Sequence, residues 1–308
     1  MIVKNAEIKD IFLFHKLVSR LFNDKYNWSD SWYKWQCFDN PFVINLKLAI
    51  ENDNLLGVFG LQQRLLLPDI HCGQISWINV NPDYKNIGIF TELSKHVLKD
   101  SEKLDLLFIF ANNNALIPCQ QKLGLKIIGK LNRLTLELTQ INKNYFKNVA
   151  YKCKKISSNT DLKSFFKFED LYMFDHSSSF RHWRFANPDS QYYKVSIPTG
   201  EYLIFKIYRS MKNKDSFGDL VDFECNLKDI DSYKKLLFSA ISELKFNNVT
   251  YATIWANEQQ QLYKAIKDIG FVESSNNTYF CIKVLKSKYS HLYNFKNWHL
   301  VQSDATNY

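Results

Sequence analysis

Apolar and polar positions along the chain fall into alternating blocks that predict strands and helices in a repeated order. Continuous or alternating apolar blocks predict strands, and apolar residues spaced every three or four positions predict helices. In the first part the order is helix 8–22, strands 46–50, 55–66 and 74–80, helix 88–101, strand 106–111, helix 115–123 and strand 133–138. In the second part it is helix 162–172, strands 192–197, 202–209 and 220–224, helix 230–244, strand 251–256, a helix ending at 269 and strand 279–284. Helices placed between strands of a mixed β-sheet predict an α/β fold in each part.

Two motifs occur twice, which predicts an internal duplication. The first is a tryptophan followed by Asn-Pro, and the second is Ala-Asn followed by a glycine after one helical stretch. The copies are Trp35, Asn40 and Pro41 with Trp183, Asn187 and Pro188, and Ala111, Asn112 and Gly124 with Ala256, Asn257 and Gly270. A nearly constant offset between copies indicates two tandem domains. We expect domain boundaries at 1–148 and 149–308, joined through the polar segment 140–158.

Composition fits this organisation. A chain of 308 residues with 46% hydrophobic residues is long enough for two cores. No apolar run approaches the roughly 20 residues that cross a bilayer, and the N-terminus lacks a signal-peptide pattern. We therefore expect a soluble, cytoplasmic protein without a membrane partner. The six cysteines stand singly, without metal-ligand spacing, and predict reduced core residues and no metal site.

The formal net charge of +9 narrows the class of partner. The lysines are spread along the chain without a block of five, and the aromatic residues lie in strand-like runs rather than between arginines. This pattern favours small phosphorylated ligands over a nucleic-acid groove.

Residues 75–93, ISWINVNPDYKNIGIFTEL, predict an anion site. An apolar strand leads into a polar turn with one glycine, Gly88, and then into an amphipathic helix. Backbone N–H groups of a first helical turn, together with the helix dipole, can cradle a pyrophosphate such as that of an acyl-CoA.

Both halves resemble the GNAT acyltransferase fold, and the whole chain resembles the tandem-GNAT N-acyltransferases of surface-polysaccharide gene clusters. The resemblance lies in NPDYKNIGIF, NNNALIPCQQKLGL, the paired Trp…Asn-Pro motifs and NWHLVQSDATNY. It implies two tandem GNAT-like domains, each a mixed β-sheet flanked by helices. It also implies transfer of an acyl group, acetyl or longer such as 3-hydroxybutanoyl, from a coenzyme A thioester. The implied acceptor is the amine of a nucleotide-linked amino sugar such as a dTDP-3-amino-3,6-dideoxyhexose, used in lipopolysaccharide or capsule biosynthesis.

The resemblance also implies where the coenzyme A thioester binds. The family's Arg/Gln-x-x-Gly-x-Gly/Ala frame reads Lys85 to Phe90 here, and the phenylalanine is compatible with phosphate binding if it points into the core. The corresponding segment 225–230 of the second half lacks a glycine, so we expect one acyl-CoA, in the N-terminal half. The C-terminal half then shapes the acceptor site, covers the cleft or stabilises the first domain. The expected cofactor-binding residues are Ile78, Asn79, Val80, Lys85, Asn86, Ile87, Gly88, Ile89, Phe90, Thr91 and Asn113.

Catalytic and acceptor residues follow from the same family pattern. The backbone N–H of Val80 is the expected oxyanion donor. The family's tyrosine acid is replaced by Gln120. The candidates for the general base are Asp304, Asp222, Glu224 and His176, each of which also fits a structural role. The expected acceptor-binding residues are Ser76, Trp77, Arg181, Arg184, Trp298 and His299, whereas the repeated Trp35 and Trp183 motifs favour an architectural role.

Two other functions remain open at this point. The first is an aminoacyl-tRNA-dependent transferase, because tandem GNAT folds also serve that reaction; it predicts no coenzyme A binding and a continuous basic face. The second is a non-catalytic acyl-CoA-binding protein, which the departures at Lys85 and Phe90 and the missing tyrosine favour.

Overall fold

The computed structural model describes residues 1–22, 28–141, 151, 153–166, 170–210 and 215–306. The chain forms two compact units that interleave along the sequence. Unit 1 contains Met1–Gly129, Asn187–Asp189 and Tyr279–Tyr293, and unit 2 contains Lys130–Ala186, Ser190–Thr278 and Asn294–Tyr308. The expected boundary at residue 148 lies outside the described residues. No helix in the described part of the chain is long and apolar enough to cross a membrane.

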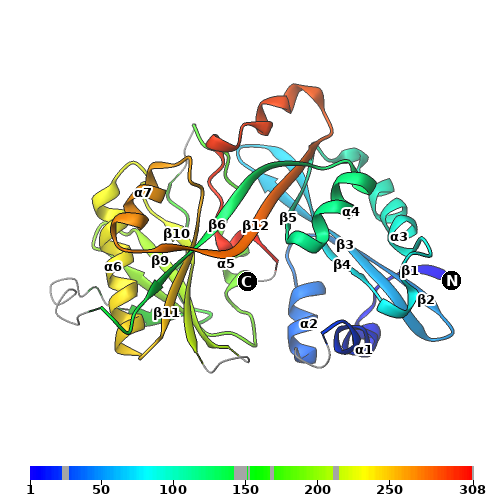
Figure 1. The fold of residues 1–308 in the computed structure, drawn as a ribbon, viewed down its shortest axis with the longest axis horizontal. Coiled ribbons are helices and arrows are strands. Elements are labelled where there is room, and N and C mark those ends of the chain that lie inside the picture. The colour runs from blue at the N-terminus through cyan, green and yellow to red at the C-terminus, as the bar shows by residue number, and fades with distance from the viewer. Residues whose placement is uncertain (23–27, 142–150, 152, 167–169, 211–214, 307–308) are drawn as a thin grey trace. The chain divides into compact units, whose positions relative to one another are not determined.

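Unit 1 is a mixed sheet with helices on both faces (Figure 1). Its strands are β1 Ile2–Asn5, β2 Ile44–Glu51, β3 Asn54–Leu66, β4 Ile70–Val80, β5 Leu106–Ala111 and the second half of β12, Val272–Val284. Its helices are α1 Ile11–Phe22, α2 Asp30–Cys37, α3 Ile89–Leu98 and α4 Asn113–Leu123, with short 3-10 helices at Ile8–Asp10, Pro82–Tyr84, Lys99–Lys103 and Ser287–Tyr293. The strands run in the order β1-β2-β3-β4-β5-β12, and β12 is antiparallel to β5.

Helices α3 and α4 share a core with the sheet of unit 1. Ile89 and Leu93 of α3 pack with Phe59 of β3 and Cys119 of α4. The helix lies so close to β3 that a Cβ on Gly57 would stand 2.9 Å from the side chain of Ile89. Helices α1 and α2 cover the other face of the sheet (Figure 1).

Strands β4 and β5 of unit 1 separate before they end. Their parallel pairing runs only from Cys72 opposite Leu106 to Gln74 opposite Phe108, although β4 continues to Val80. On its other side, β4 has a bulge against β3, and Trp77 within the bulge has a φ of 54°. The diverging strands leave a wedge, which we call the β4–β5 wedge.

Unit 2 repeats this plan. Its strands are β6 Lys126–Glu137, which enters the unit at Lys130, β7 Cys153–Lys155, β8 Tyr192–Ser196, β9 Tyr202–Arg209, β10 Ser216–Glu224 and β11 Tyr251–Ala256, in the order β6-β11-β10-β9-β8-β7. Its helices are α5 Ser178–Arg184, α6 Ile230–Phe246 and α7 Gln261–Asp268, with 3-10 helices at Phe295–Asn297 and Gln302–Asp304. Leu236 and Ile241 of α6 pack on Leu203 and Phe205 of β9.

The local details also repeat. Strands β10 and β11 pair in parallel only as far as Leu220 opposite Ile254, and β10 has a bulge against β9 at this level. Unit 2 therefore has a wedge as well, which we call the β10–β11 wedge.

The two Asn-Pro motifs also form matching turns. In each, the asparagine Oδ1 accepts a hydrogen bond from the backbone N–H two residues further along the chain, at 2.9 Å for Asn40 and 3.0 Å for Asn187. Both Asn-Pro motifs therefore form the same kind of turn, which reverses the direction of the chain.

One predicted helix is wrong over its described residues. The segment from Leu162 to Phe166 is not helical. The N–H groups of Phe165 and Phe166 donate to Oε1 of Glu224 at 2.6 and 2.8 Å, so the carboxylate holds this backbone in place of a helical hydrogen-bond ladder. Helices α2 and α5 and strands β1 and β7 were not predicted.

Candidate active site

The strand–turn–helix of residues 75–93 forms an anion cradle in unit 1. Strand β4 ends at Val80, and α3 begins after Gly88, whose φ of 88° is left-handed. A Cβ on Gly88 would meet no heavy atom within 4 Å, so the space before the helix is open. The first N–H groups of α3 have no acceptor within their own helix and, with the helix dipole, favour an anion there.

The β4–β5 wedge beside this cradle is open. Trp77, Ile78, Asn79 and Val80 are all half-exposed, whereas the β4 residues before them are mostly buried. A half-exposed strand end next to an anion cradle fits the pantetheine arm and pyrophosphate of coenzyme A, so the residues present fit that cofactor.

The predicted cofactor residues belong to β4, to the turn that follows it and to the starts of α3 and α4. Lys85, Asn86, Ile87 and Gly88 are exposed in the turn, and Asn113 is exposed at the start of α4. The residues at the start of the helix differ: Ile89 is buried in the core, and Phe90 and Thr91 are half-buried.

The phenylalanine in the loop frame points toward the core, which is the orientation compatible with phosphate binding. The ring centroid of Phe90 lies 5.7 Å from that of Phe59. The side chain therefore turns away from the turn whose backbone would meet phosphate. The contacts of the cofactor residues with coenzyme A remain predictions.

A cavity of about 520 Å³ borders the cradle, and sequence reasoning missed part of it. Among its lining residues, Lys95 and His96 lie one turn beyond Thr91 on α3, and both pair with Glu92 at 3.7 and 3.2 Å. The full lining is Met1, Val3, Ile87, Gly88, Thr91, Glu92, Lys95 and His96. The helical spacing of these α3 residues was the available sequence signal.

The corresponding wedge of unit 2 is closed by the C-terminal tail, residues 294–305. All β10 residues from Gly218 to Glu224 are buried. Phe223 of β10 and Trp255 of β11 line, with His299 and Val301 of the tail, a cavity of only about 20 Å³. That volume is about one water molecule, so the tail leaves no room there for a pantetheine arm.

The duplicated asparagines show the difference between the two wedges. Asn112 of unit 1 is exposed and its Oδ1 caps α4 by accepting the Ala115 N–H at 3.1 Å. Asn257 of unit 2 is buried, and its Nδ2 donates to the carbonyl oxygens of Phe295 and Trp298 at 3.0 and 3.3 Å. In unit 2 this motif therefore binds the tail.

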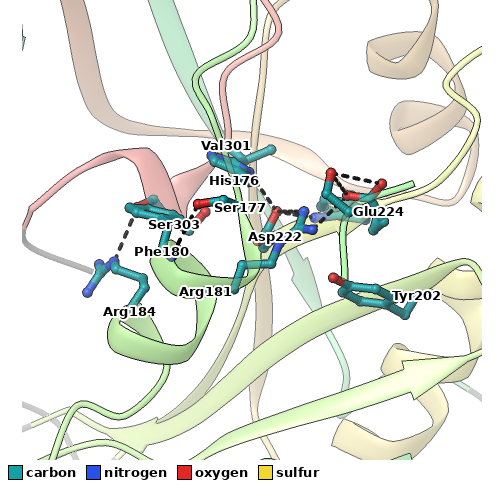
Figure 2. Close-up of polar contacts among 12 residues, drawn as sticks. His176, Ser177, Phe180, Arg181, Arg184, Tyr202, Asp222, Glu224, Val301 and Ser303 are labelled. Carbon is teal, nitrogen blue, oxygen red and sulfur yellow. Dashed lines mark hydrogen bonds and ion pairs between the residues drawn. The ribbon is translucent and has the colours of Figure 1, made fainter. Parts of the chain in front are cut away.

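A buried ionic cluster joins the tail to β10 and α5 (Figure 2). Nε2 of His176 lies 2.7 Å from Oδ1 of Asp304, and its Nδ1 lies 3.3 Å from Oδ1 of Asp222. Arg181 contacts Asp222 through Nε at 2.9 Å and Glu224 through Nη1 at 2.7 Å. All five side chains are at least nine-tenths buried.

Backbone contacts complete the attachment of the tail. Arg184 donates from Nε to the Ser303 carbonyl at 3.2 Å and from Nη2 to the Ala305 carbonyl at 3.0 Å (Figure 2). Asp304 accepts the Val301 N–H at 2.9 Å, which fixes the last 3-10 turn. The guanidinium of Arg184 thus donates its hydrogen bonds to backbone carbonyl oxygens of the tail rather than to an anion.

The cluster fixes the charge of its members. Burial would lower the pKa of His176, but the nearby charges of Asp304 and Asp222 outweigh it and raise the pKa to about 9. Burial would raise the pKa of Asp222, but Arg181 and His176 hold it well below its usual range. Burial lowers the pKa of His299 to about 4, so this ring is neutral at pH 7.

The structure thus separates the predicted acceptor and base residues into two groups. Asp304, Asp222, Glu224, His176, Arg181 and Arg184 meet in the buried cluster of unit 2, and Trp298 and His299 belong to the tail beside it. Ser76, Trp77 and Val80 lie on β4 of unit 1. Their roles in catalysis or acceptor binding remain predictions. Sequence reasoning missed that the first group forms one network, because its members are up to 128 residues apart in the chain.

Comparison with known families agrees with this geometry. Residues 11–125 match the acetyltransferase (GNAT) family. The matched segment has a GNAT-type acyltransferase fold and contains the anion cradle and the β4–β5 wedge. These features support an enzyme that transfers an acyl group from acyl-CoA to an amine. No curated protein matches the sequence.

Solved structures resemble nearly the whole chain at low sequence identity. A tandem GNAT protein from the clavulanic acid biosynthesis pathway matches with 11% identity and a TM-score of 0.60, over 92% of this chain and 98% of its own. Saccharomyces cerevisiae N-myristoyltransferase with bound myristoyl-CoA matches with 11% identity and a TM-score of 0.59, over 91% and 77%. A fungal glucosamine N-acetyltransferase region matches with 10% identity and a TM-score of 0.59, over 92% and 38%. The fold is thus tandem GNAT, each unit a mixed sheet flanked by helices.

Proposed function

We propose that this GNAT enzyme binds one acyl-CoA, in unit 1, and transfers the acyl group to the amine of a nucleotide-linked amino sugar. The observation that supports a single cofactor is the contrast between the two wedges. The β4–β5 wedge is half-exposed beside a glycine-containing anion cradle, whereas the tail fills the β10–β11 wedge.

Three observations favour an amino sugar as the acceptor. The C-terminal segment NWHLVQSDATNY resembles that of sugar-modifying tandem GNAT enzymes. One structural neighbour is a glucosamine N-acetyltransferase region. The net charge of +9 suits an enzyme that binds two phosphorylated ligands. The acyl chain is acetyl or longer, such as 3-hydroxybutanoyl.

The buried cluster supports a structural role for the acidic residues of unit 2. A general base must reach the proton that it removes. The carboxylates of Asp222, Glu224 and Asp304 are buried and already accept hydrogen bonds. We therefore assign the C-terminal unit to support of the fold, and the base to a residue of unit 1.

Two glycine substitutions test the cofactor site. Gly88 and Gly200 both have positive φ values, 88° and 95°, and neither would bring a new Cβ within 4 Å of another atom. Gly88→Asp and Gly200→Asp therefore impose similar backbone strain, but only the first places a carboxylate at the anion cradle. Calorimetric titration with coenzyme A and acetyl-CoA should give one site per chain in the wild type and in Gly200→Asp, and no binding in Gly88→Asp.

A thiol-release assay with nucleotide-linked amino sugars then tests the acceptor. Turnover with an amino sugar supports the proposal, whereas binding of acetyl-CoA without turnover on any amino sugar contradicts the acceptor class. Absence of coenzyme A binding by the wild type would contradict the proposed function as a whole and favour an aminoacyl-tRNA donor.

A further inference from the structure

Trp77 occupies an unusual backbone position at the open wedge. It lies in the β4 bulge with a φ of 54°, a value that a bulky residue rarely adopts and that costs conformational energy. The ring is held by aromatic contacts from two helices: Phe14 of α1 at 5.5 Å, and Trp32 of α2 at 5.7 Å between ring centroids. Packing thus maintains a strained residue where β4 leaves β5.

The aromatic cluster continues to a partly exposed surface. Trp28 stacks on Trp32 with centroids 4.5 Å apart and an interplanar angle of 14°. Trp32 and Tyr33 are buried, whereas Trp28 and Trp77 are half-exposed. Half-exposed aromatic rings at a ligand site provide apolar faces for a ring-shaped ligand at low entropic cost. This surface lies on the α1–α2 side of the sheet of unit 1.

A histidine–aspartate pair packs against the same aromatic cluster. Nε2 of His15 on α1 is 2.6 Å from Oδ1 of Asp30 on α2, and the His15 ring packs edge-on against Tyr33 at 4.8 Å. Tyr33 in turn lies 6.0 Å from Trp77, centroid to centroid. The side chain of His15 is 31% exposed, so it is accessible to a ligand, unlike the buried carboxylates of unit 2.

The pair fixes the chemistry of the imidazole. A carboxylate on Nε2 favours the tautomer with the proton on that nitrogen, which leaves the lone pair on Nδ1. An imidazole oriented by a carboxylate is a common arrangement for proton transfer. The titratable groups that contact His15 from the helix packed on it are Asp30 and Tyr33, within the described part of the chain. Burial raises the pKa of Tyr33 far above its usual value, so Tyr33 stays neutral.

We propose that Trp77 and Trp28 bind the ring of the acceptor and that Nδ1 of His15 takes the proton of its ammonium group. This inference rests on the proposed function, because it assigns the acceptor of that same reaction. The amine lone pair, once freed, forms the C–N bond to the thioester carbonyl carbon. The C–S bond then breaks with its electron pair on sulfur, and the second amine proton goes to the thiolate. The products are the amide, free coenzyme A thiol and imidazolium, which returns its proton to water.

The acceptor class that fits is an amine on a ring with an apolar face, such as an amino sugar or its nucleotide. A linear polyamine would make little use of two aromatic faces, so the site should discriminate against it. Kinetic constants can distinguish the two roles. Trp77 binds the acceptor and should therefore affect mainly the KM of the acceptor, whereas His15 transfers a proton and should affect mainly kcat.

The test compares His15→Gln with His71→Gln. His71 is an exposed histidine of unit 1 near the start of β4, and it does not line the cavity beside the cradle. His15→Gln should lower kcat roughly 100-fold or more and remove the dependence of kcat on pH that a general base produces. His71→Gln should keep the wild-type kcat and pH profile, and neither variant should change the Kd of acetyl-CoA. Trp77→Leu should raise acceptor KM with a smaller change in kcat.

The outcomes separate this inference from the proposed function. An active wild type with an unchanged rate and pH profile in His15→Gln would overturn the role of His15, while the proposed function would stand. Equal turnover of spermidine and amino sugars would overturn the role of the aromatic surface. A wild type that binds no acetyl-CoA would overturn both proposals.

Discussion

Nε2 of His176 lies 2.7 Å from Oδ1 of Asp304, so a residue just before α5 holds the C-terminal tail through one buried contact. The other ring nitrogen faces Asp222 of β10 at 3.3 Å, and the ring stacks on Phe180 at 5.1 Å. A single imidazolium therefore bridges two buried carboxylates from distant parts of the chain.

Stability should fall on the alkaline side because of this bridge. The pKa of His176 is raised to about 9 in the folded protein, against about 6.5 in the unfolded chain. Its contribution is complete below pH 6.5 and is lost as the pH rises through 9, and it amounts to about 3 kcal/mol as an order of magnitude. Thermal unfolding of the wild type and His176→Gln, measured from pH 6 to 10, should show Tm values that converge toward pH 10.

The exposed His71 provides the control for this titration. His71→Gln should leave the difference in Tm between pH 6 and pH 10 unchanged. A wild type whose Tm is flat from pH 7 to 10 would contradict a protonated His176.

Removal of Arg181 should be much more damaging than removal of an exposed cation. Arg181→Met removes the cation that pairs with the buried carboxylates of Asp222 and Glu224. The loss should lower the free energy of unfolding by roughly 3 to 5 kcal/mol. Lys228 pairs with Asp170 on the surface of the same unit, and Lys228→Met should have no measurable effect. Chemical denaturation of both variants measures the difference, and equal midpoints would contradict a stabilising role for the cluster.

Loss of the two duplicated asparagines should destabilise the protein to different extents, more at the buried Asn257 than at the exposed Asn112. Asn257→Ala removes the donor to two buried carbonyl oxygens of the tail and should cost roughly 2 to 3 kcal/mol. Asn112→Ala removes one exposed helix cap and should cost about 1 kcal/mol. Acrylamide quenching should report increased access to the buried Trp298 only in Asn257→Ala. A larger loss in Asn112→Ala would refute the assignment of Asn257 to the tail.

Phe90→Leu should leave coenzyme A binding nearly intact. The ring of Phe90 packs on Phe59, so its loss affects the core under α3 rather than the backbone N–H groups of the turn. We expect a lower Tm with a Kd for coenzyme A within a few-fold of the wild type, measured by calorimetry. A large loss of affinity without a change in Tm would mean that the side chain itself contacts the cofactor.

Hydrophobic patterning predicted much of the fold because strands buried on both faces are continuous apolar runs. The bounds of β5, β9 and β11 agree with the predicted strands, and helix α1 lies within the predicted 8–22. The error at 162–172 arose because an amphipathic pattern cannot show that Glu224, some 60 residues away, binds the same backbone.

The site was only partly predictable for a related reason. The anion cradle is local in sequence, so its glycine and flanking strand were recognisable. The ionic cluster, the closure of the second wedge and the strained Trp77 depend on contacts between segments far apart in the chain. Each residue of the cluster was a candidate alone. Nothing in the sequence showed that the cations of His176 and Arg181 pair with three buried carboxylates, those of Asp222, Glu224 and Asp304.

The interleaving of the two units has a consequence for synthesis of the protein. The edge of β5 is paired by Tyr279–Val284, which follow nearly all of unit 2 in the chain. Until the ribosome has released these residues, β5 has an open edge that other chains can pair with. The N-terminal unit therefore reaches its final form only after residues 279–284 have been synthesised, and a gene fragment ending near residue 148 would yield it with that edge uncovered.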